Sequence, residues 1–494
     1  MDFKAKIEGI ATHQVVSLIL DLLGRSSDEN LIRLTYLGEK LTSDEEVLSG
    51  IAGVRRLLED PRHPAKRLFR RVLDYLPPQN SHSLFETLFY RAWFLGGKKR
   101  EQFEAEHGFW PPFVMILSPT LRCNLRCKGC YTLGYGTKPE LPYDLVKKVL
   151  AECQEMGINF ITVLGGEPFV YPNLFQMIEE HPQIFFQVYT NGTLMSKEKA
   201  KRLSELGNAM VVISIEGYEE ETDRWRGKGV YKKIMNAFDD LRETRVLIGT
   251  SATVTRQNVE VVASEPFVDF MMGKGSFAQM YFLYIPVNGQ ADFSLMVTPE
   301  QRNHLRKQVM YFRETKPMFF LDFWNDGPHV NGCIAGGRRY FHLNAKGDVE
   351  PCVYTHIATD NIYNTTLSKA LNSPLFRSIR ARQPHNSNHL RPCMIIDNPH
   401  VMRQVIEETK PRFTHPGAEE IYTTKSHDMD AYAERFAHFA DRVWQNEYIK
   451  GQAKPSIREA EEGLAESINR SQQDTFGAMI MRLSPNRENP TKDI

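Results

Sequence analysis

The chain has 494 residues, of which 41% are hydrophobic and 25% charged, and its formal net charge is zero. This length predicts about two to four domains, and the balanced charge gives no global indication of nucleic acid as a partner. Seven cysteines are too few for a secreted disulfide scaffold of this size, and we expect neither a signal peptide nor a membrane-spanning segment. The sequence therefore predicts a cytoplasmic protein, with peripheral contact to the inner face of a membrane as an open alternative.

Residues 1–108 are predicted to form a helical N-terminal domain, with helices at 43–58 and 66–76. The segment 84–95 is apolar around almost its whole circumference, which is typical of a helix that is either buried or in contact with lipid. Two interpretations follow. The helix packs inside the domain, or it docks on a membrane surface with the basic run 98–100 at the headgroups.

Strands and helices alternate from residue 109 to residue 315. The predicted strands are 113–118, 160–165, 185–190, 210–215, 246–254 and 279–286. The predicted helices are 142–156, 173–181, 196–206, 229–243, 261–273 and 298–315. Two of the strands are apolar on both faces, as buried parallel strands require. Six right-handed βα units would curl into an α/β fold of the partial (β/α)6 barrel type.

Three cysteines follow the first predicted strand in the spacing C-x3-C-x2-C, at Cys123, Cys127 and Cys130. Thiolates suit iron–sulfur clusters and zinc. Three thiolates leave one iron of a four-iron cluster open for chemistry. A structural zinc site is the alternative, but no histidine lies between residues 108 and 180 to act as a local fourth ligand.

Polar or glycine-rich segments also follow the next three predicted strands. They are Gly165-Gly166-Glu167-Pro168, Thr190-Asn191-Gly192 and Ser214-Ile215-Glu216-Gly217. In barrels of this kind the chemistry gathers at the carboxyl ends of the strands. We therefore expect these segments and the three-cysteine loop to form one site.

Together these motifs resemble the radical SAM superfamily over residues 109–315. The resemblance implies that the three cysteines hold a [4Fe–4S] cluster whose open iron binds S-adenosylmethionine (SAM). It also implies that SAM is cleaved to methionine and a 5′-deoxyadenosyl radical, which abstracts hydrogen from an unactivated C–H bond. The implied SAM-binding residues are Gly165, Gly166 and Glu167 toward the ammonium, Thr190, Asn191, Ser214 toward the ribose or carboxylate, and Arg226 toward the carboxylate.

This chain departs from the family pattern at one position. The family usually has an aromatic residue just before the third cysteine, where this chain has Gly129. We expect Tyr131, on the other side of that cysteine, to supply the adenine contact. No individual catalytic residue is identified from the sequence.

Residues 316–400 are predicted to form a separate, loop-rich module that contains Cys333, Cys352 and Cys393. Their spacing resembles the SPASM-type auxiliary cluster module, in its shorter one-cluster "twitch" form. The resemblance implies a second [4Fe–4S] cluster with an unknown fourth ligand. His356 is a candidate for that ligand, and an ordinary surface or core histidine is the favoured alternative. Buried structural cysteines are the alternative.

The remaining segments carry less chemistry. Residues 401–449 are predicted to be helical and 450–494 to be a flexible polar tail. Cys153 lies on the apolar face of a predicted helix and is expected in the core. The aromatic residues of 319–324 are more typical of domain-interface packing than of a substrate pocket.

The substrate is less well determined than the reaction. The apolar helix 84–95, with the run 107–113 that leads into the barrel, favours a lipid or other long apolar substrate and C–C bond formation. The alternatives are a peptide- or protein-modifying maturase and an enzyme of a small-molecule or cofactor pathway. A non-enzymatic electron-transfer protein is the least favoured. The family resemblance implies an electron donor such as ferredoxin or flavodoxin.

Overall fold

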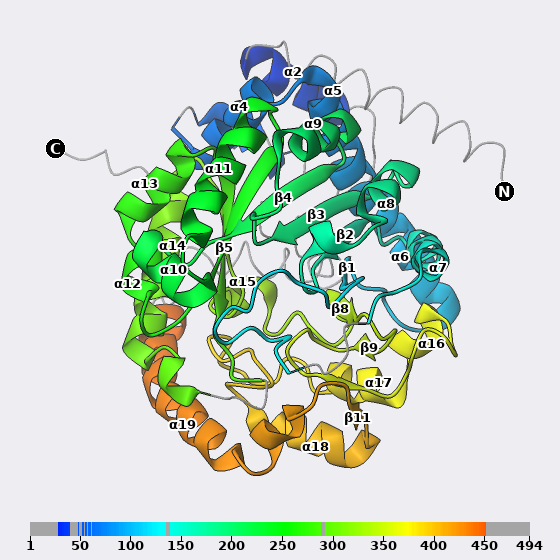
Figure 1. Cartoon of the computed structure of the whole chain (residues 1–494), viewed down its shortest axis with the longest axis vertical. Coiled ribbons are helices and arrows are strands. Elements are labelled where there is room, and N and C mark those ends of the chain that lie inside the picture. Colours follow the sequence, from blue (N-terminus) through cyan, green and yellow to red (C-terminus); the bar gives the residue numbers. More distant parts are fainter. Residues whose placement is uncertain are drawn as a thin grey trace.

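Figure 1 shows the computed structural model of the chain, which describes residues 28–39, 48, 52–53, 55–56, 58–60, 62–134, 139–287 and 292–450. The helix expected at 43–58 lies mostly outside the described residues, and so does the tail beyond Lys450. A short helix, α2 (Asp28–Glu39), precedes the main body of the structure.

A nine-stranded sheet organises the molecule, with the order β7-β6-β5-β4-β3-β2-β1-β8-β9. The strands are β1 (Val114–Leu117), β2 (Phe160–Val163), β3 (Phe185–Thr190), β4 (Ala209–Ser214), β5 (Leu247–Val254), β6 (Ser276–Leu283), β7 (Phe319–Asp322), β8 (Tyr340–Leu343) and β9 (Val349–Glu350). All neighbouring pairs are parallel except β8 and β9, which form an antiparallel hairpin. The parallel α/β arrangement confirms the predicted fold class.

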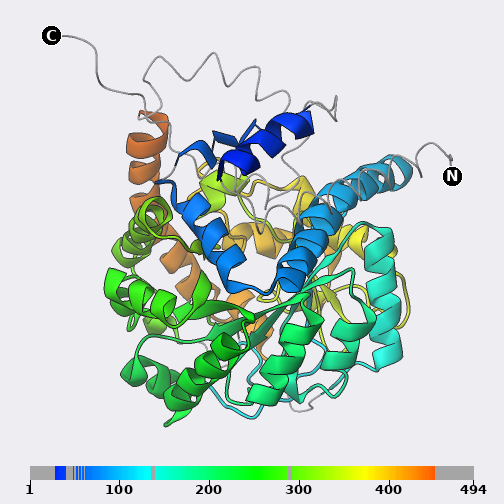
Figure 2. The ribbon, with the colours of Figure 1, turned by 90° about the horizontal axis from the view of Figure 1, so that it is seen from above.

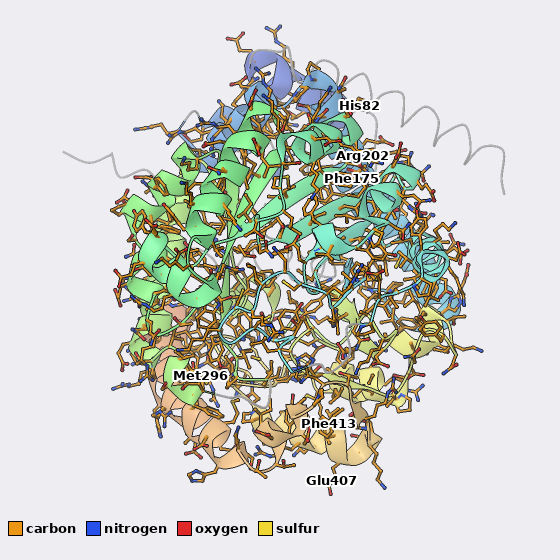
Figure 3. All side chains as sticks on the ribbon, viewed as in Figure 1. His82, Phe175, Arg202, Met296, Glu407 and Phe413 are labelled. Carbon is orange, nitrogen blue, oxygen red and sulfur yellow. The ribbon has the colours of Figure 1, made fainter. Side chains whose placement is uncertain are left out.

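Helices on the outer face alternate with the strands along the chain (Figure 1). They are α7 (Tyr143–Glu155), α8 (Leu174–Glu180), α9 (Lys197–Leu206), α10 (Glu219–Arg226), α11 (Val230–Glu243), α12 (Val259–Val262), α13 (Glu265–Gly273) and α14 (Pro299–Thr315), with short 3-10 turns η2 (Pro168–Val170) and η3 (Phe293–Leu295). Their apolar sides join one continuous core, which includes the fully buried Cys153. Neighbouring helices also meet at the surface, where the Arg202 guanidinium lies 4.7 Å from the centre of the Phe175 ring (Figure 3).

The N-terminal helices cover the opposite face of the sheet (Figure 2). They are α4 (Pro64–Tyr75), α5 (Pro78–Leu84), the π-helix η1 (Phe85–Leu95) and α6 (Gly96–His107). Leu88 and Ala92 of η1 pack in a second apolar cluster with Phe160 and Phe185 of the strands. No residue of η1 is exposed, so the apolar helix expected at 84–95 packs internally. Within the described residues, no helix is long and apolar enough to cross a bilayer.

The sheet continues beyond the predicted barrel. β7 adds a seventh parallel strand beside β6, and β8 pairs with β1 on the other side. The rest of the C-terminal region consists of α15 (Gly327–Val330), β10 (Ile357–Ala358), α16 (Leu367–Leu371), α17 (Pro374–Ala381), α18 (Pro399–Thr409), β11 (Arg412–Phe413), η4 (Ala418–Tyr422), α19 (Ser426–Val443) and η5 (Trp444–Ile449). The module predicted at 316–400 is thus joined to the barrel through one hydrogen-bonded sheet.

Candidate functional site

The three-cysteine loop follows β1 and lies at the carboxyl end of the sheet. Its thiols are free and half-buried, and burial raises the pKa of Cys123 and raises that of Cys127 to about 12. The Cys123 sulfur accepts hydrogen bonds from the Leu125 N–H at 3.4 Å and from the Asn191 side-chain amide at 3.8 Å. The Cys130 N–H donates to the Cys127 carbonyl at 3.4 Å, which closes a turn between the second and third cysteines. The structure therefore brings the three predicted ligands together.

The two glycines at the end of β2 allow a close approach between backbones. A Cβ atom on Gly165 would lie 2.3 Å from the Thr120 carbonyl oxygen, and one on Gly166 would lie 2.1 Å from that of Arg122. The N–H groups of Gly166 and Glu167 donate to these same two carbonyls, both at 2.8 Å. The glycines thus fix the end of β2 against the start of the cysteine loop, a role that the sequence did not reveal.

Glu167 joins the ends of β2 and β3. Its side chain is fully buried and accepts hydrogen bonds from the Thr190 hydroxyl at 2.7 Å and from the N–H groups of Asn191 at 2.8 Å and Phe169 at 3.1 Å. Burial raises the pKa of Glu167, and these hydrogen bonds oppose that rise. The carboxylate is held in one orientation beside the cysteine loop, and its predicted contact with the SAM ammonium stays a prediction.

Arg226, at the end of α10, lies between the fourth strand and the cysteine loop. Its Nη2 donates to Glu216 Oε1 at 2.7 Å, its Nε donates to the other Glu216 oxygen, and its Nη1 lies 3.9 Å from the Cys127 sulfur. Burial lowers the pKa of Arg226, but the Glu216 carboxylate and the nearby Cys127 sulfur outweigh burial and raise that pKa. The Glu216 side chain is 1% exposed. Sequence reasoning missed its role, although Glu216 stood in the fourth strand-end segment.

Ser214, at the end of β4, faces the neighbouring strand β5. The Ser251 hydroxyl donates to the Ser214 oxygen at 3.3 Å. This places the Ser214 hydroxyl at the same edge of the sheet as Thr190, the last residue of β3, and Asn191, which follows it. Its predicted contact with the ribose or carboxylate of SAM stays a prediction.

Gly129 lies directly against two aromatic rings. Its φ is +68°, and a Cβ atom there would lie 2.7 Å from the Tyr284 ring and 2.9 Å from the Trp225 ring. These two rings pack edge to face with centroids 5.8 Å apart. Trp225 and Tyr284 therefore fill the space next to Gly129, and no sequence signal near the cysteines indicated them.

Tyr131 points from the cysteine loop toward the C-terminal region. Its hydroxyl lies 3.5 Å from the Gly165 carbonyl oxygen, and its ring centroid lies 6.0 Å from that of Tyr354 and 6.2 Å from that of His356. Burial raises the pKa of Tyr131 well above its usual range. Its predicted adenine contact stays a prediction.

The second cysteine set also lies together. Cys333 follows α15, Cys352 follows the β8–β9 hairpin and Cys393 precedes α18. Burial raises the pKa of each thiol to about 12, and each is raised further by at least one other cysteine of the set. The Tyr340 hydroxyl lies 3.0 Å from the Cys352 sulfur. The β8–β9 hairpin thus delivers Cys352 to its partners.

His356 is buried and lies four positions after Cys352 in the chain. Its ring centroid lies 4.9 Å from that of His415. Burial lowers the pKa of His356 well below its usual range, and the neighbouring His415 and His342 add to this. A neutral imidazole keeps a lone pair for a metal, and its role as fourth ligand stays a prediction.

Both cysteine sets fit an iron–sulfur cluster. Among the described residues, no group of three His, Cys, Asp or Glu side chains is placed to hold one single metal ion. A four-iron cluster binds a thiolate at each iron rather than at one shared metal. Three thiols in each set, amide and guanidinium donors at the sulfurs of the first, and a hydroxyl at Cys352 of the second match such a cluster and its outer shell.

Tyr354 contacts both cysteine regions, because its N–H donates to the Cys352 sulfur at 3.5 Å and its ring centroid lies 6.0 Å from that of Tyr131, next to Cys130. Burial raises its pKa well above the usual range, and both Cys352 and Cys130 contribute to that shift. Its ring centroid lies 5.7 Å from that of Trp324. The Phe323 ring stacks on Phe282 of β6, with centroids 4.6 Å apart. A group of aromatic side chains in mutual contact therefore extends from Tyr131, beside the first set, past Tyr354, beside the second.

Two stretches of the sequence match known protein families. Residues 117–260 match the radical SAM superfamily, and residues 333–394 match the iron–sulfur cluster-binding domain called SPASM. The chain thus contains a radical SAM domain and a SPASM domain. The first domain implies a [4Fe–4S] cluster with SAM, and the second implies an auxiliary cluster.

Several characterised proteins are similar to this chain. Fe-coproporphyrin III synthase of Methanosarcina barkeri is 30% identical over 151 residues, which is 30% of this chain and 38% of that protein. AdoMet-dependent heme synthase of the same organism is 24% identical over 302 residues, covering 54% of this chain and 85% of that protein. PqqA peptide cyclase of Bradyrhizobium diazoefficiens is 26% identical over 258 residues, covering 49% and 67%. The match to the first of these relatives thus spans well under half of its length.

The fold has solved counterparts. Streptococcus suis SuiB bound to S-adenosylmethionine superposes with a TM-score of 0.53 at 17% identity, covering 72% of this chain and 92% of that one. SuiB bound to precursor peptide SuiA gives a TM-score of 0.52 at 18% identity, covering 69% and 81%. At these identities the similarity establishes the shared fold.

Proposed function

We propose that the protein is a radical SAM enzyme that acts on a C–H bond of a substrate held between its two cysteine sets. The observation that carries the proposal is the position of Tyr354, whose N–H donates to the Cys352 sulfur at 3.5 Å and whose ring centroid lies 6.0 Å from that of Tyr131, the residue after Cys130. When bound, the first cluster with SAM supplies the 5′-deoxyadenosyl radical that abstracts hydrogen. An electron donor such as ferredoxin or flavodoxin would reduce that cluster.

The residues of the chain would orient the cofactor and exclude water. Glu167, fixed by three hydrogen bonds, would bind the SAM ammonium. Arg226 would hold the loop at Cys127 while its charge is balanced by Glu216. The aromatic side chains around Tyr354 would shield the radical from solvent, because a reactive radical must meet only its substrate.

We propose a peptide or a cofactor precursor as the substrate. Similarity to PqqA peptide cyclase supports the first class, and similarity to AdoMet-dependent heme synthase supports the second. The argument for a lipid substrate depended on helix 84–95 as a docking surface, and η1 instead packs against the sheet with no exposed residue. The position of this helix therefore gives no support to a lipid substrate.

SAM cleavage tests the proposal directly. Protein reconstituted with iron and sulfide without oxygen should form 5′-deoxyadenosine from SAM and dithionite, and Cys127→Ala should form none. A substrate should stimulate this reaction, and peptides and haem precursors can be compared in that assay. Fully loaded protein that forms no 5′-deoxyadenosine would refute the proposed reaction.

A further inference from the structure

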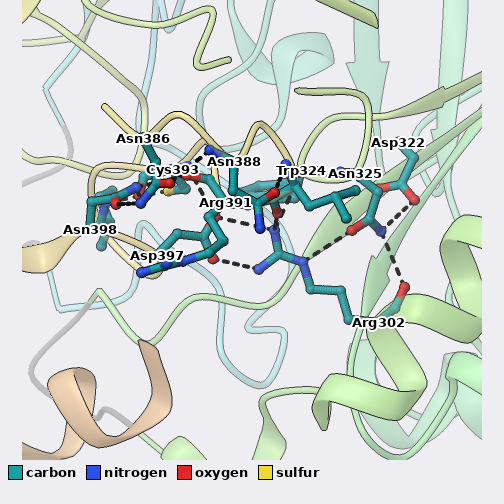
Figure 4. Close-up of polar contacts among 12 residues, drawn as sticks. Arg302, Asp322, Trp324, Asn325, Asn386, Asn388, Arg391, Cys393, Asp397 and Asn398 are labelled. Carbon is teal, nitrogen blue, oxygen red and sulfur yellow. Dashed lines mark hydrogen bonds and ion pairs between the residues drawn. The ribbon is translucent and has the colours of Figure 1, made fainter. Parts of the chain in front are cut away.

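The Arg302 side chain reaches from α14 to the loop that carries Cys393 (Figure 4). It lies near the start of α14, and its side chain and that of Asp397 are both 0% exposed. Arg302 Nη1 donates to Asp397 Oδ1 at 2.6 Å, and Nη2 donates to Oδ2 at 3.2 Å. Such a two-pronged bond fixes orientation as well as distance.

The same carboxylate holds the backbone at Cys393. The Cys393 N–H donates to Asp397 Oδ2 at 3.0 Å. In return, the N–H groups of Asp397 and Asn398 donate to the Cys393 carbonyl at 3.2 and 2.9 Å. Asp397 therefore closes a tight loop from which the Cys393 thiol projects. Both of its oxygens are engaged by Arg302 and Cys393, so Asp397 serves better as an anchor than as a cluster ligand.

Arg302 also binds three other parts of the structure. Its Nη2 donates to the Leu390 carbonyl at 3.2 Å, just before the Cys393 loop, and its Nε donates to Asn325 Oδ1 at 3.1 Å, just after β7. The ring of Phe436 on α19 lies 3.8 Å from the guanidinium carbon. One buried cation thus fixes the Cys393 loop relative to the last strand of the barrel.

A purely structural role would not require ions here. Removing two charges from water costs free energy that largely offsets their mutual attraction. Apolar side chains of similar size therefore often stabilise a core equally well. A charged pair offers direction that apolar contacts lack, and outer-shell partners of this kind orient metal ligands.

We propose that Arg302 and Asp397 are positioning residues for the auxiliary cluster, which hold the Cys393 thiol toward Cys333 and Cys352 and fix that cluster relative to the barrel. This inference depends on the proposed function, because the auxiliary cluster is part of it. The pair acts through the loop and touches neither SAM nor substrate.

The test isolates the auxiliary cluster in a parent variant that carries Cys123→Ala, Cys127→Ala and Cys130→Ala. After anaerobic reconstitution, iron per chain, the midpoint potential by electron paramagnetic resonance and the rate of iron release to a chelator are measured. Adding Asp397→Asn should shift the potential and speed iron release about 10- to 100-fold. If that variant does not fold, Arg302→Lys is the substitute, because lysine keeps the charge but cannot form the two-pronged bond to Asp397. It should shift the midpoint potential and the rate of iron release in the same directions as Asp397→Asn.

The matched control is Asp430→Asn, which removes an ion pair to Arg403 in the same region whose side chains are 38% and 32% exposed. It should leave potential and iron release unchanged. A parent that binds about four irons, with both Arg302→Lys and Asp397→Asn matching its potential and release rate, would overturn the positioning role and leave the proposed function standing. A lower melting temperature without any change in potential would also overturn it. A parent that binds no iron would refute the auxiliary cluster itself.

Discussion

Gly166→Ala tests the contact that joins the second strand to the cysteine loop. The new Cβ atom would lie 2.1 Å from the Arg122 carbonyl oxygen and 2.8 Å from the Leu121 carbonyl carbon. These are backbone atoms, so no side-chain rotation can relieve the overlap. The loop that carries Cys123 must therefore move away from the end of β2.

The size of the effect follows from what that movement breaks. The hydrogen bonds from the N–H groups of Gly166 and Glu167 to the loop, both 2.8 Å long, would be lost or stretched. Each contributes about 0.5–1.5 kcal/mol net, and overpacking a tight site costs about 1–3 kcal/mol. We expect Gly166→Ala to lower the free energy of unfolding by about 2–6 kcal/mol.

Denaturant unfolding of the metal-free protein measures this loss, and iron content after reconstitution measures its effect on the loop. Gly273→Ala is the matched control, because a Cβ atom at that helical position has nothing within 4 Å. It should be neutral or stabilising by about 0.4–1 kcal/mol. If Gly166→Ala unfolds at the wild-type denaturant concentration and binds the wild-type amount of iron, the close backbone contact is not a feature of the folded protein.

Three further predictions concern the C-terminal half. Burial and the neighbouring Asp326 raise the pKa of Asp322 to about 7 from 3.8, so its contribution to stability is full below pH 3.8 and falls as the pH rises to about 7. Asp322→Asn should therefore gain stability relative to wild type across that window in denaturant titrations, and a pH-independent difference would contradict the assigned shift. Cys352→Ala should lose auxiliary-cluster iron but keep the SAM-responsive resonance signal, and unchanged iron per chain would rule out that ligand. Tyr340→Phe removes the hydroxyl 3.0 Å from the Cys352 sulfur and should lower the auxiliary midpoint potential, whereas an unaltered potential would show that the hydroxyl does not bond to the bound thiolate.

The barrel strands were predictable because each carries its own signal. Phe160–Val163 and Ala209–Ser214 are apolar on both faces, which only a doubly covered strand tolerates. β7 was missed because Phe319–Asp322 is a short run whose aromatic residues were interpreted as interface packing. Its identity as a strand comes from pairing with β6, which is a tertiary property.

The residues of the candidate site likewise fall into those that a local sequence pattern identifies and those that only folding brings together. The cysteines, Glu167 and the strand-end polar residues could be singled out from the sequence because each of them lies within a short motif. Trp225 lies 96 positions beyond Gly129 in the chain, and only folding brings its ring to that glycine. No local pattern distinguishes such a residue from ordinary core.

The two buried guanidinium–carboxylate pairs show why charge alone is a poor guide to such sites. Arg226 pairs with Glu216 beside the first cysteine set, and Arg302 pairs with Asp397 beside the second. In sequence, Arg302 looks like a solvated residue, because arginine is mostly exposed in proteins, and Arg226 was singled out only through the family resemblance. Each pair is neutral overall, so neither adds net positive charge to offset a negatively charged cluster. Their common effect is to fix a cysteine-bearing loop against a strand end, which makes geometry the property that variants of these pairs should disturb first.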